Sequence, residues 1–199
     1  MNTFVATVLG ILSRKAHYYA KNYAMKSARP RGEWRGKADE YPCDDDAVRQ
    51  AGYKPGTPCR FVCSRVADPL RFRHESGVEY LVGDGVSDGG STPPFLRKPC
   101  AAWADLEPFG AHKNAFYFHD AMYHDGGVFA RKDGDDWRWL KLNRAQADFL
   151  FLQALTATGR NAEVFAIWRA VRRGGARAWR RARQDDIAPF RVSCNSAGE

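Results

Sequence analysis

Residues 111–127 decide the fold, and they read AHKNAFYFHDAMYHDGG. Apolar residues recur here every three or four positions, which predicts a helix over 111–124 that ends at Gly126-Gly127. Residues three or four apart share a helix face, so His119 and Tyr123 point the same way, while Asp120 points to an adjacent side. One helical turn therefore presents an imidazole to one neighbour and a carboxylate to another.

A second helix is predicted over 143–158. Asn143 is a good N-cap, and Gln146 completes a capping box three residues later. Asp148 is an isolated acid in an apolar stretch, where a buried carboxylate without a partner would be costly. If the two helices pair antiparallel, Asp148 reaches His119. A carboxylate on one imidazole nitrogen fixes the tautomer and leaves the other nitrogen free as a base.

Strand-like alternation precedes the first helix and also separates the two helices. Turn residues divide the first part into three strands, which predicts a small antiparallel meander, and two short apolar pieces predict a hairpin. The meander strands and the hairpin are expected at residues 60–66, 70–73, 78–82 and 128–142. The fold class that follows is α+β, with the meander followed by the antiparallel helix pair that carries the site.

Residues 83–91 form a glycine-rich loop, GDGVSDGGS, between the meander and the first helix. Glycine permits positive φ angles, so backbone carbonyls in such a loop can turn toward a ligand. Hard cations such as Ca²⁺ bind carbonyls and carboxylates together. Asp88 and Asp120 are the carboxylates that we expect to serve such a cation.

Helices are also predicted near both ends of the chain. An amphipathic helix is expected over 2–27, followed by a polar, turn-rich connector. A basic helical segment is expected over 163–183, interrupted at Gly174-Gly175. We therefore divide the chain into an N-terminal helix with its connector, a central domain with the site, and a poorly ordered tail, at residues 1–58, 59–185 and 186–199.

Composition limits the class of protein and its surroundings. The 199 residues suffice for one domain with a hydrophobic core, and the formal charge of +8 favours an anionic partner. Such partners include nucleic acid, a phospholipid surface and the polymers of the bacterial envelope. The five cysteines are an odd number and cannot all pair within the chain. The apolar run at 4–12 precedes its basic residues, unlike a signal peptide, so we expect synthesis in the bacterial cytoplasm without secretion.

Residues 61–179 resemble a domain family of unknown function found in tailed phages and prophages. Four blocks carry this resemblance, and they occur in the family's order. They read SDGGSTP over 87–93, HDAMY over 119–123, RAQAD over 144–148 and RAVRRGG over 169–175. The resemblance implies a phage or prophage protein, located in the virion or delivered to a membrane.

The first three blocks also resemble the site of secreted phospholipase A2, especially its small bacterial branch. That resemblance implies that His119 is the general base that activates water, that Asp148 orients it, and that Tyr123 braces Asp148. It further implies that Asp120, Asp88 and carbonyls near Gly89 bind Ca²⁺, which would polarise the ester carbonyl. The implied activity is calcium-dependent hydrolysis of phospholipid esters at a lipid interface.

Two other hypotheses stay open at this point. In the first, the protein is a non-enzymatic phage accessory protein, and the His-Asp network only specifies the helix pair. In the second, it is a metal-dependent phosphohydrolase whose ligands include His74 or His112 together with His119, Asp120 and Asp148. The accessibility of His119 distinguishes the accessory-protein hypothesis from the enzyme hypothesis, because a catalytic His119 must open to a cleft. The sequence does not indicate an oligomeric state.

Overall fold

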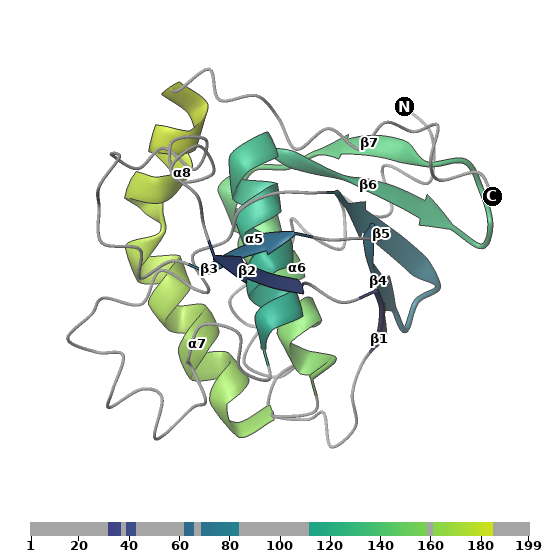
Figure 1. Cartoon of the computed structure of the whole chain (residues 1–199), viewed down its shortest axis with the longest axis horizontal. Helices are drawn as coiled ribbons and strands as arrows, with labels where there is room; N and C mark the ends of the chain where they lie inside the picture. The colour runs from purple at the N-terminus through teal and green to yellow at the C-terminus, as the bar shows by residue number, and fades with distance from the viewer. Residues whose placement is uncertain are drawn as a thin grey trace.

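A five-stranded antiparallel sheet forms one side of the molecule (Figure 1). The computed structural model describes residues 32–36, 39–42, 62–65, 69–83, 112–158 and 161–184. The strand order in the sheet is β1-β4-β5-β6-β7, and every neighbouring pair is antiparallel. The five strands are Gly32–Arg35, Leu70–His74, Val78–Val82, Gly127–Lys132 and Arg138–Lys141.

Helices cover this sheet in two further layers (Figure 1). The described helices are α5 at Lys113–Asp125, α6 at Arg144–Thr156, α7 at Asn161–Gly174 and α8 at Ala176–Gln184. α5 contacts β5 and β6, α6 contacts β1 and β4, and the outer helices α7 and α8 contact α6 and α5 respectively. This arrangement confirms the α+β class. It also explains why every residue from Gln146 to Thr156 is buried, because α6 lies between the sheet and α7.

The helices α5 and α6 run in opposite directions. His112, just before α5, contacts Thr158, just after α6. Further along, the rings of Phe116 and Phe151 lie 5.4 Å apart, and the last turns of α5 meet the first turns of α6. The β6–β7 hairpin connects the two helices, as expected for residues 128–142. Gly126 ends α5 in the left-handed conformation, at φ 72°, which glycine adopts without strain.

The predicted meander is correct for two of its three strands. β4 and β5 pair as a hairpin. The strand expected at 60–66 corresponds to β3 at Val62–Arg65, which pairs instead with β2 at Asp39–Pro42 in a separate two-stranded sheet. The reason lies in the edges of the hairpin. β1 occupies the free edge of β4, and β6 occupies the free edge of β5, so β3 has no edge to join.

β1 comes from the stretch that was expected to be a polar connector, so the main sheet takes a strand from before residue 59. Its side chain Trp34 lies 5.1 Å from the ring of Phe72 and 5.8 Å from that of Phe118. A single aromatic residue thus anchors a strand of four residues to the core. The expected helix over 2–27, loop residues 84–91 and the tail at 186–199 lie outside the described residues.

The start of α6 depends on Asn143, which gives a first prediction. The Asn143 side chain accepts a hydrogen bond from the Gln146 backbone N–H at 3.0 Å, and the Gln146 side chain accepts one from the Asn143 backbone N–H at 2.8 Å. Asn143→Ala should therefore lower the free energy of unfolding by about 0.5–2 kcal/mol, measured by urea denaturation. Lys141→Ala, at an exposed position just before the cap, is the control and should have little effect. Equal losses in both variants would contradict this role of the cap.

Candidate functional site

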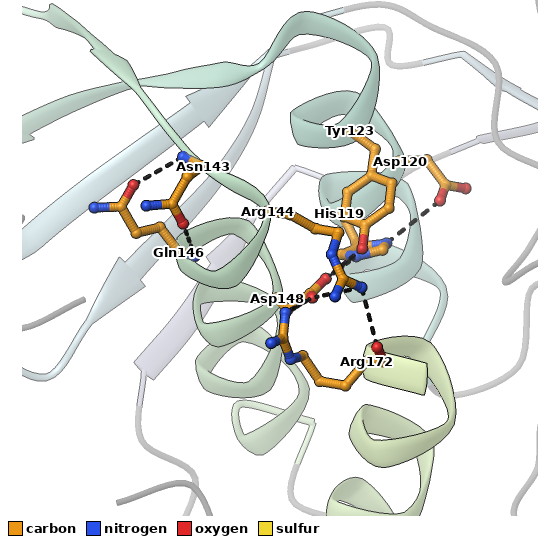
Figure 2. A network of polar contacts seen from close by, with 8 residues as sticks. All are labelled: His119, Asp120, Tyr123, Asn143, Arg144, Gln146, Asp148 and Arg172. Atoms are coloured by element: carbon orange, nitrogen blue, oxygen red, sulfur yellow. Dashed lines mark hydrogen bonds and ion pairs between the residues drawn. The ribbon is translucent and has the colours of Figure 1, made fainter. Parts of the chain in front are cut away.

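The carboxylate of Asp148 is the centre of a buried polar network (Figure 2). Asp148 lies on α6 with no exposed surface. Its Oδ1 lies 3.2 Å from His119 Nε2 and accepts a hydrogen bond from the Tyr123 hydroxyl at 2.5 Å. Its Oδ2 accepts a hydrogen bond from Arg172 Nη1 at 2.6 Å and lies 3.7 Å from Arg144 Nη1. Both oxygens are therefore occupied by donors from α5 and α7, and Arg144 of α6 adds an ion pair.

The imidazole of His119 is held in one orientation. Its ring lies 4.1 Å from the ring of Tyr123 and 4.4 Å from that of Phe151. An ionised carboxylate only accepts hydrogen bonds, so Nε2 carries the proton that points to Asp148. In the neutral ring, the lone pair is then on Nδ1, which lies 3.6 Å from Oδ1 of Asp120. The basic nitrogen thus faces Asp120 and not the buried carboxylate.

Exposure increases from Asp148 toward Asp120. His119 is 5% exposed, and the side chain of Asp120 is 23% exposed. The distance of 3.6 Å between His119 Nδ1 and Asp120 Oδ1 is longer than a good hydrogen bond. The carboxylate beside Nδ1 is thus partly exposed, whereas the carboxylate beside Nε2 is fully buried.

The electrostatic environment sets the protonation state of each group. Burial lowers the pKa of His119, but the carboxylates of Asp120 and Asp148 outweigh it, and the net shift is upward. Burial alone would raise the pKa of Asp148, yet His119, Tyr123 and Arg172 lower it below its usual value. Burial and the nearby charge of Asp148 raise the pKa of Tyr123. At neutral pH, Asp148 is therefore ionised and Tyr123 is a hydrogen-bond donor.

Two arginines of the network were not expected from the sequence to have a role. Arg144 is four residues before Asp148, so this pair had a local signal in the RAQAD block. Arg172 had none, because it reaches Asp148 from α7, 24 residues along the chain. Arg144 also donates a hydrogen bond to the Arg172 backbone carbonyl at 3.0 Å, which ties the start of α6 to the end of α7.

The structure brings together His119, Tyr123 and Asp148 and places Asp120 beside them, whereas Asp88 and Gly89 lie outside the described residues. The other histidines of the phosphohydrolase hypothesis lie elsewhere. His112 Nδ1 is 2.9 Å from Thr158 Oγ1, about 15 Å along the helix direction from Asp148.

His74 lies at the β4–β5 turn, where its Nδ1 is 2.8 Å from Ser76 Oγ. Within the part of the chain that the structure describes, no three His, Cys, Asp or Glu side chains are grouped so that they could hold a metal ion. The ligand set of the phosphohydrolase hypothesis is therefore not assembled among the described residues.

Comparison with known proteins gave no match to this chain, whether against protein-family models, curated proteins or solved structures. The resemblances to the phage family and to phospholipase A2 therefore rest on the sequence blocks alone. A separate structural property bears on membranes. None of the described helices is long and apolar enough to cross a bilayer.

Proposed function

We propose that this chain is an ester hydrolase in which His119 is the general base and Asp148 orients it. One observation carries the proposal. His119 Nε2 lies 3.2 Å from the buried carboxylate of Asp148, which leaves Nδ1 as the basic nitrogen, on the side of the ring that faces the partly exposed Asp120. This is the arrangement that general-base catalysis by histidine requires.

The reaction follows from that geometry. His119 Nδ1 takes a proton from water, and the oxygen of that water forms a bond to the carbonyl carbon of the ester. The tetrahedral intermediate then breaks its bond to the alcohol oxygen, and the imidazolium of His119 returns the proton to that oxygen. The products are a carboxylic acid and an alcohol. Asp148 stays ionised throughout and stabilises the imidazolium.

Tyr123 and the arginines keep Asp148 in place during this cycle. The Tyr123 hydroxyl donates to the same oxygen as His119 Nε2, so the carboxylate cannot rotate without losing both contacts. The raised pKa of Tyr123 keeps that proton on the hydroxyl at neutral pH. These contacts support the bracing role for Tyr123 that the phospholipase resemblance implies.

Calcium is the cofactor that we propose for this site. Ca²⁺ takes about six to eight oxygen ligands, and the described residues offer Asp120 beside His119. Asp88 and the carbonyl of Gly89 are the other proposed ligands. When bound, the ion would polarise the ester carbonyl and stabilise negative charge on its oxygen.

Anionic phospholipid is the substrate class that we propose, in a protein of phage or prophage origin. The charge of +8 supports attraction to an anionic surface. Four exposed arginines on α7 and α8 share one side of the helical segment, because they are spaced by four, four and three residues. They are Arg169, Arg173, Arg177 and Arg180.

Release of fatty acid from anionic phospholipid vesicles tests the proposal. We expect release at millimolar calcium and none with a chelator. Complete absence of release over neutral and mildly alkaline pH, from a folded protein with calcium, would contradict the enzyme hypothesis.

Calcium binding can be tested without activity. A ligand that binds only the native state raises the melting temperature, Tm, so we expect Tm to increase with calcium concentration. Asp120→Asn should abolish this increase, whereas Asp135→Asn, in the exposed β6–β7 turn, should preserve it. Identical Tm values with calcium and with chelator would remove calcium from the proposal. The catalytic role of the His119–Asp148 pair would then be tested by the vesicle assay alone.

One observation favours the accessory-protein alternative. Both oxygens of Asp148 are saturated by donors, and His119 is almost fully buried, as in a network that serves only to fix helix packing. This alternative predicts a stable protein without hydrolysis of any vesicle. The vesicle assay therefore separates the two functions.

A further inference from the structure

Gly175, between α7 and α8, touches the site through Tyr123. A Cβ atom added to Gly175 would lie 2.5 Å from the Tyr123 hydroxyl oxygen and 3.2 Å from its Cε1. The first distance is shorter than real Cβ contacts allow and the second is tighter than most of them, so a methyl group at residue 175 requires the tyrosine to shift. Gly174 is different, because nothing lies within 4 Å of a Cβ added there.

The backbone conformation of Gly175 does not itself require glycine. Gly175 N–H donates to Val171 O at 2.7 Å, and Trp179 N–H donates to Gly175 O at 2.9 Å. These bonds continue the helical pattern from α7 into α8. The φ angle of Gly175 is also not in the positive range that favours glycine. The close approach of the Tyr123 hydroxyl, together with that of the Val171 carbonyl at 2.9 Å from an added Cβ, is therefore the reason for a residue without a side chain.

Two neighbours of Gly175 on the same side of the helix also contact the site. Arg172, three residues before it, donates to Asp148 Oδ2 at 2.6 Å. Trp179, four residues after it, packs edge-on against Tyr123 with ring centres 5.0 Å apart. Spacings of three and four residues place all three positions on one helix face. We call this the R-G-W face, defined by Arg172, Gly175 and Trp179.

We propose that the R-G-W face is the third wall of the site and that its three residues are positioning residues. Gly175 leaves room for the Tyr123 hydroxyl on Asp148, Trp179 supports the tyrosine ring, and Arg172 holds the second carboxylate oxygen. Together they fix the carboxylate that orients His119. The effect of these residues on catalysis rests on the proposed hydrolase function. Their effect on the position of Tyr123 can be tested without any measurement of activity.

Gly175→Ala and Gly174→Ala in the full chain form a matched pair. Alanine favours helix over glycine, so Gly174→Ala should leave Tm unchanged or raise it slightly. Gly175→Ala should lower Tm by about 5 °C, because the new methyl group overlaps Tyr123. A Gly175→Ala variant with unchanged Tm, or an equal loss in both variants, would overturn the inference.

A double-mutant cycle identifies the group that the methyl displaces. Tyr123→Phe removes the hydroxyl oxygen, which is the nearest side-chain atom, so Gly175→Ala should cost clearly less Tm in that background. The carbonyl of Val171 would lie 2.9 Å from the added Cβ and is the competing cause. An undiminished loss in the Tyr123→Phe background would assign the strain to that carbonyl and overturn the inference.

Kinetics on anionic vesicles test the positioning role. Gly175→Ala and Arg172→Gln should each lower kcat by about 10-fold to 100-fold with little change in KM, because a displaced base loses rate and not substrate binding. Arg138→Gln is the matched control, since Arg138 is an exposed arginine on β7, outside the site and outside the row of arginines on α7 and α8, and its kcat should stay within about twofold. Loss of kcat in all three variants, or in none, would overturn the positioning role. Absence of hydrolysis by the wild type would refute the proposed function. The double-mutant cycle measured by Tm would still show whether Gly175 makes room for Tyr123.

Discussion

His119→Asn should remain folded and should lose ester hydrolysis by about 10²–10⁴-fold, the usual effect of removing a general base. Asparagine is smaller than histidine and its amide matches the position of Nδ1 and not that of Nε2, so the contact with Asp148 is lost, while Tyr123 and Arg172 still hold the carboxylate. Asparagine cannot take a proton from water at neutral pH, so the first step of the reaction fails. The measurement is kcat/KM on anionic vesicles, with Tm determined on the same samples.

His124→Asn is the control for this substitution. His124 lies in the last turn of the same helix, where its Nδ1 is 3.3 Å from Asp125 Oδ1. We expect its hydrolysis to equal that of the wild type. If His119 is only structural, His119→Asn should instead lower stability by about 1–3 kcal/mol, the cost of a disturbed buried polar pair. Equal hydrolysis in both variants would exclude His119 as the base.

The helix pair could be predicted from the sequence because its signals are local. Gly126 ends α5, Asn143 and Gln146 begin α6, and both features lie within a few residues of the boundary that they set. The contact between His119 and Asp148 followed from one further argument, that an isolated acid in an apolar helix needs a partner. The structure places the two side chains at 3.2 Å.

Which strands pair with each other in the sheet could not be predicted in this way. β1 joins the sheet through Trp34, whose neighbours Phe72 and Phe118 are distant in sequence. An alternating pattern shows that a segment is a strand but does not show which edge it joins, and β3 was assigned to the wrong neighbour for that reason.

Gly175 was interpreted from the sequence only as an interruption of a basic helix. Its function as a close contact of Tyr123 depends on the packing of α8 against α5, which no local pattern encodes. Arg172 likewise looked like one of several surface arginines. A lone buried acid indicates that it has a partner. The sequence does not show which of the several arginines on the later basic helix is that partner.

Asp148→Ala should lower the free energy of unfolding by about 3–5 kcal/mol, because it removes the acceptor that a buried network shares. The substitution leaves the Tyr123 hydroxyl and His119 Nε2 buried without Asp148 and places the charges of Arg144 and Arg172 close together without an anion between them. For a chain of this size the expected fall in Tm is on the order of 10 °C. Asp136→Ala, at an exposed position of the β6–β7 turn, is the control and should change stability little.

The pH dependence of this loss identifies the ionised carboxylate as its cause. The pKa of Asp148 is lowered in the folded protein, because His119, Tyr123 and Arg172 outweigh burial. A group of this kind binds more protons in the unfolded state, so its contribution is present above the unfolded-state pKa of about 3.9 and is lost as pH falls through the folded-state value. Urea denaturation of wild type and Asp148→Ala should therefore give a smaller difference below about pH 4 than at pH 5. A difference that stayed constant down to the acid unfolding of the wild type would mean that lost packing, and not the charge of Asp148, accounts for the effect.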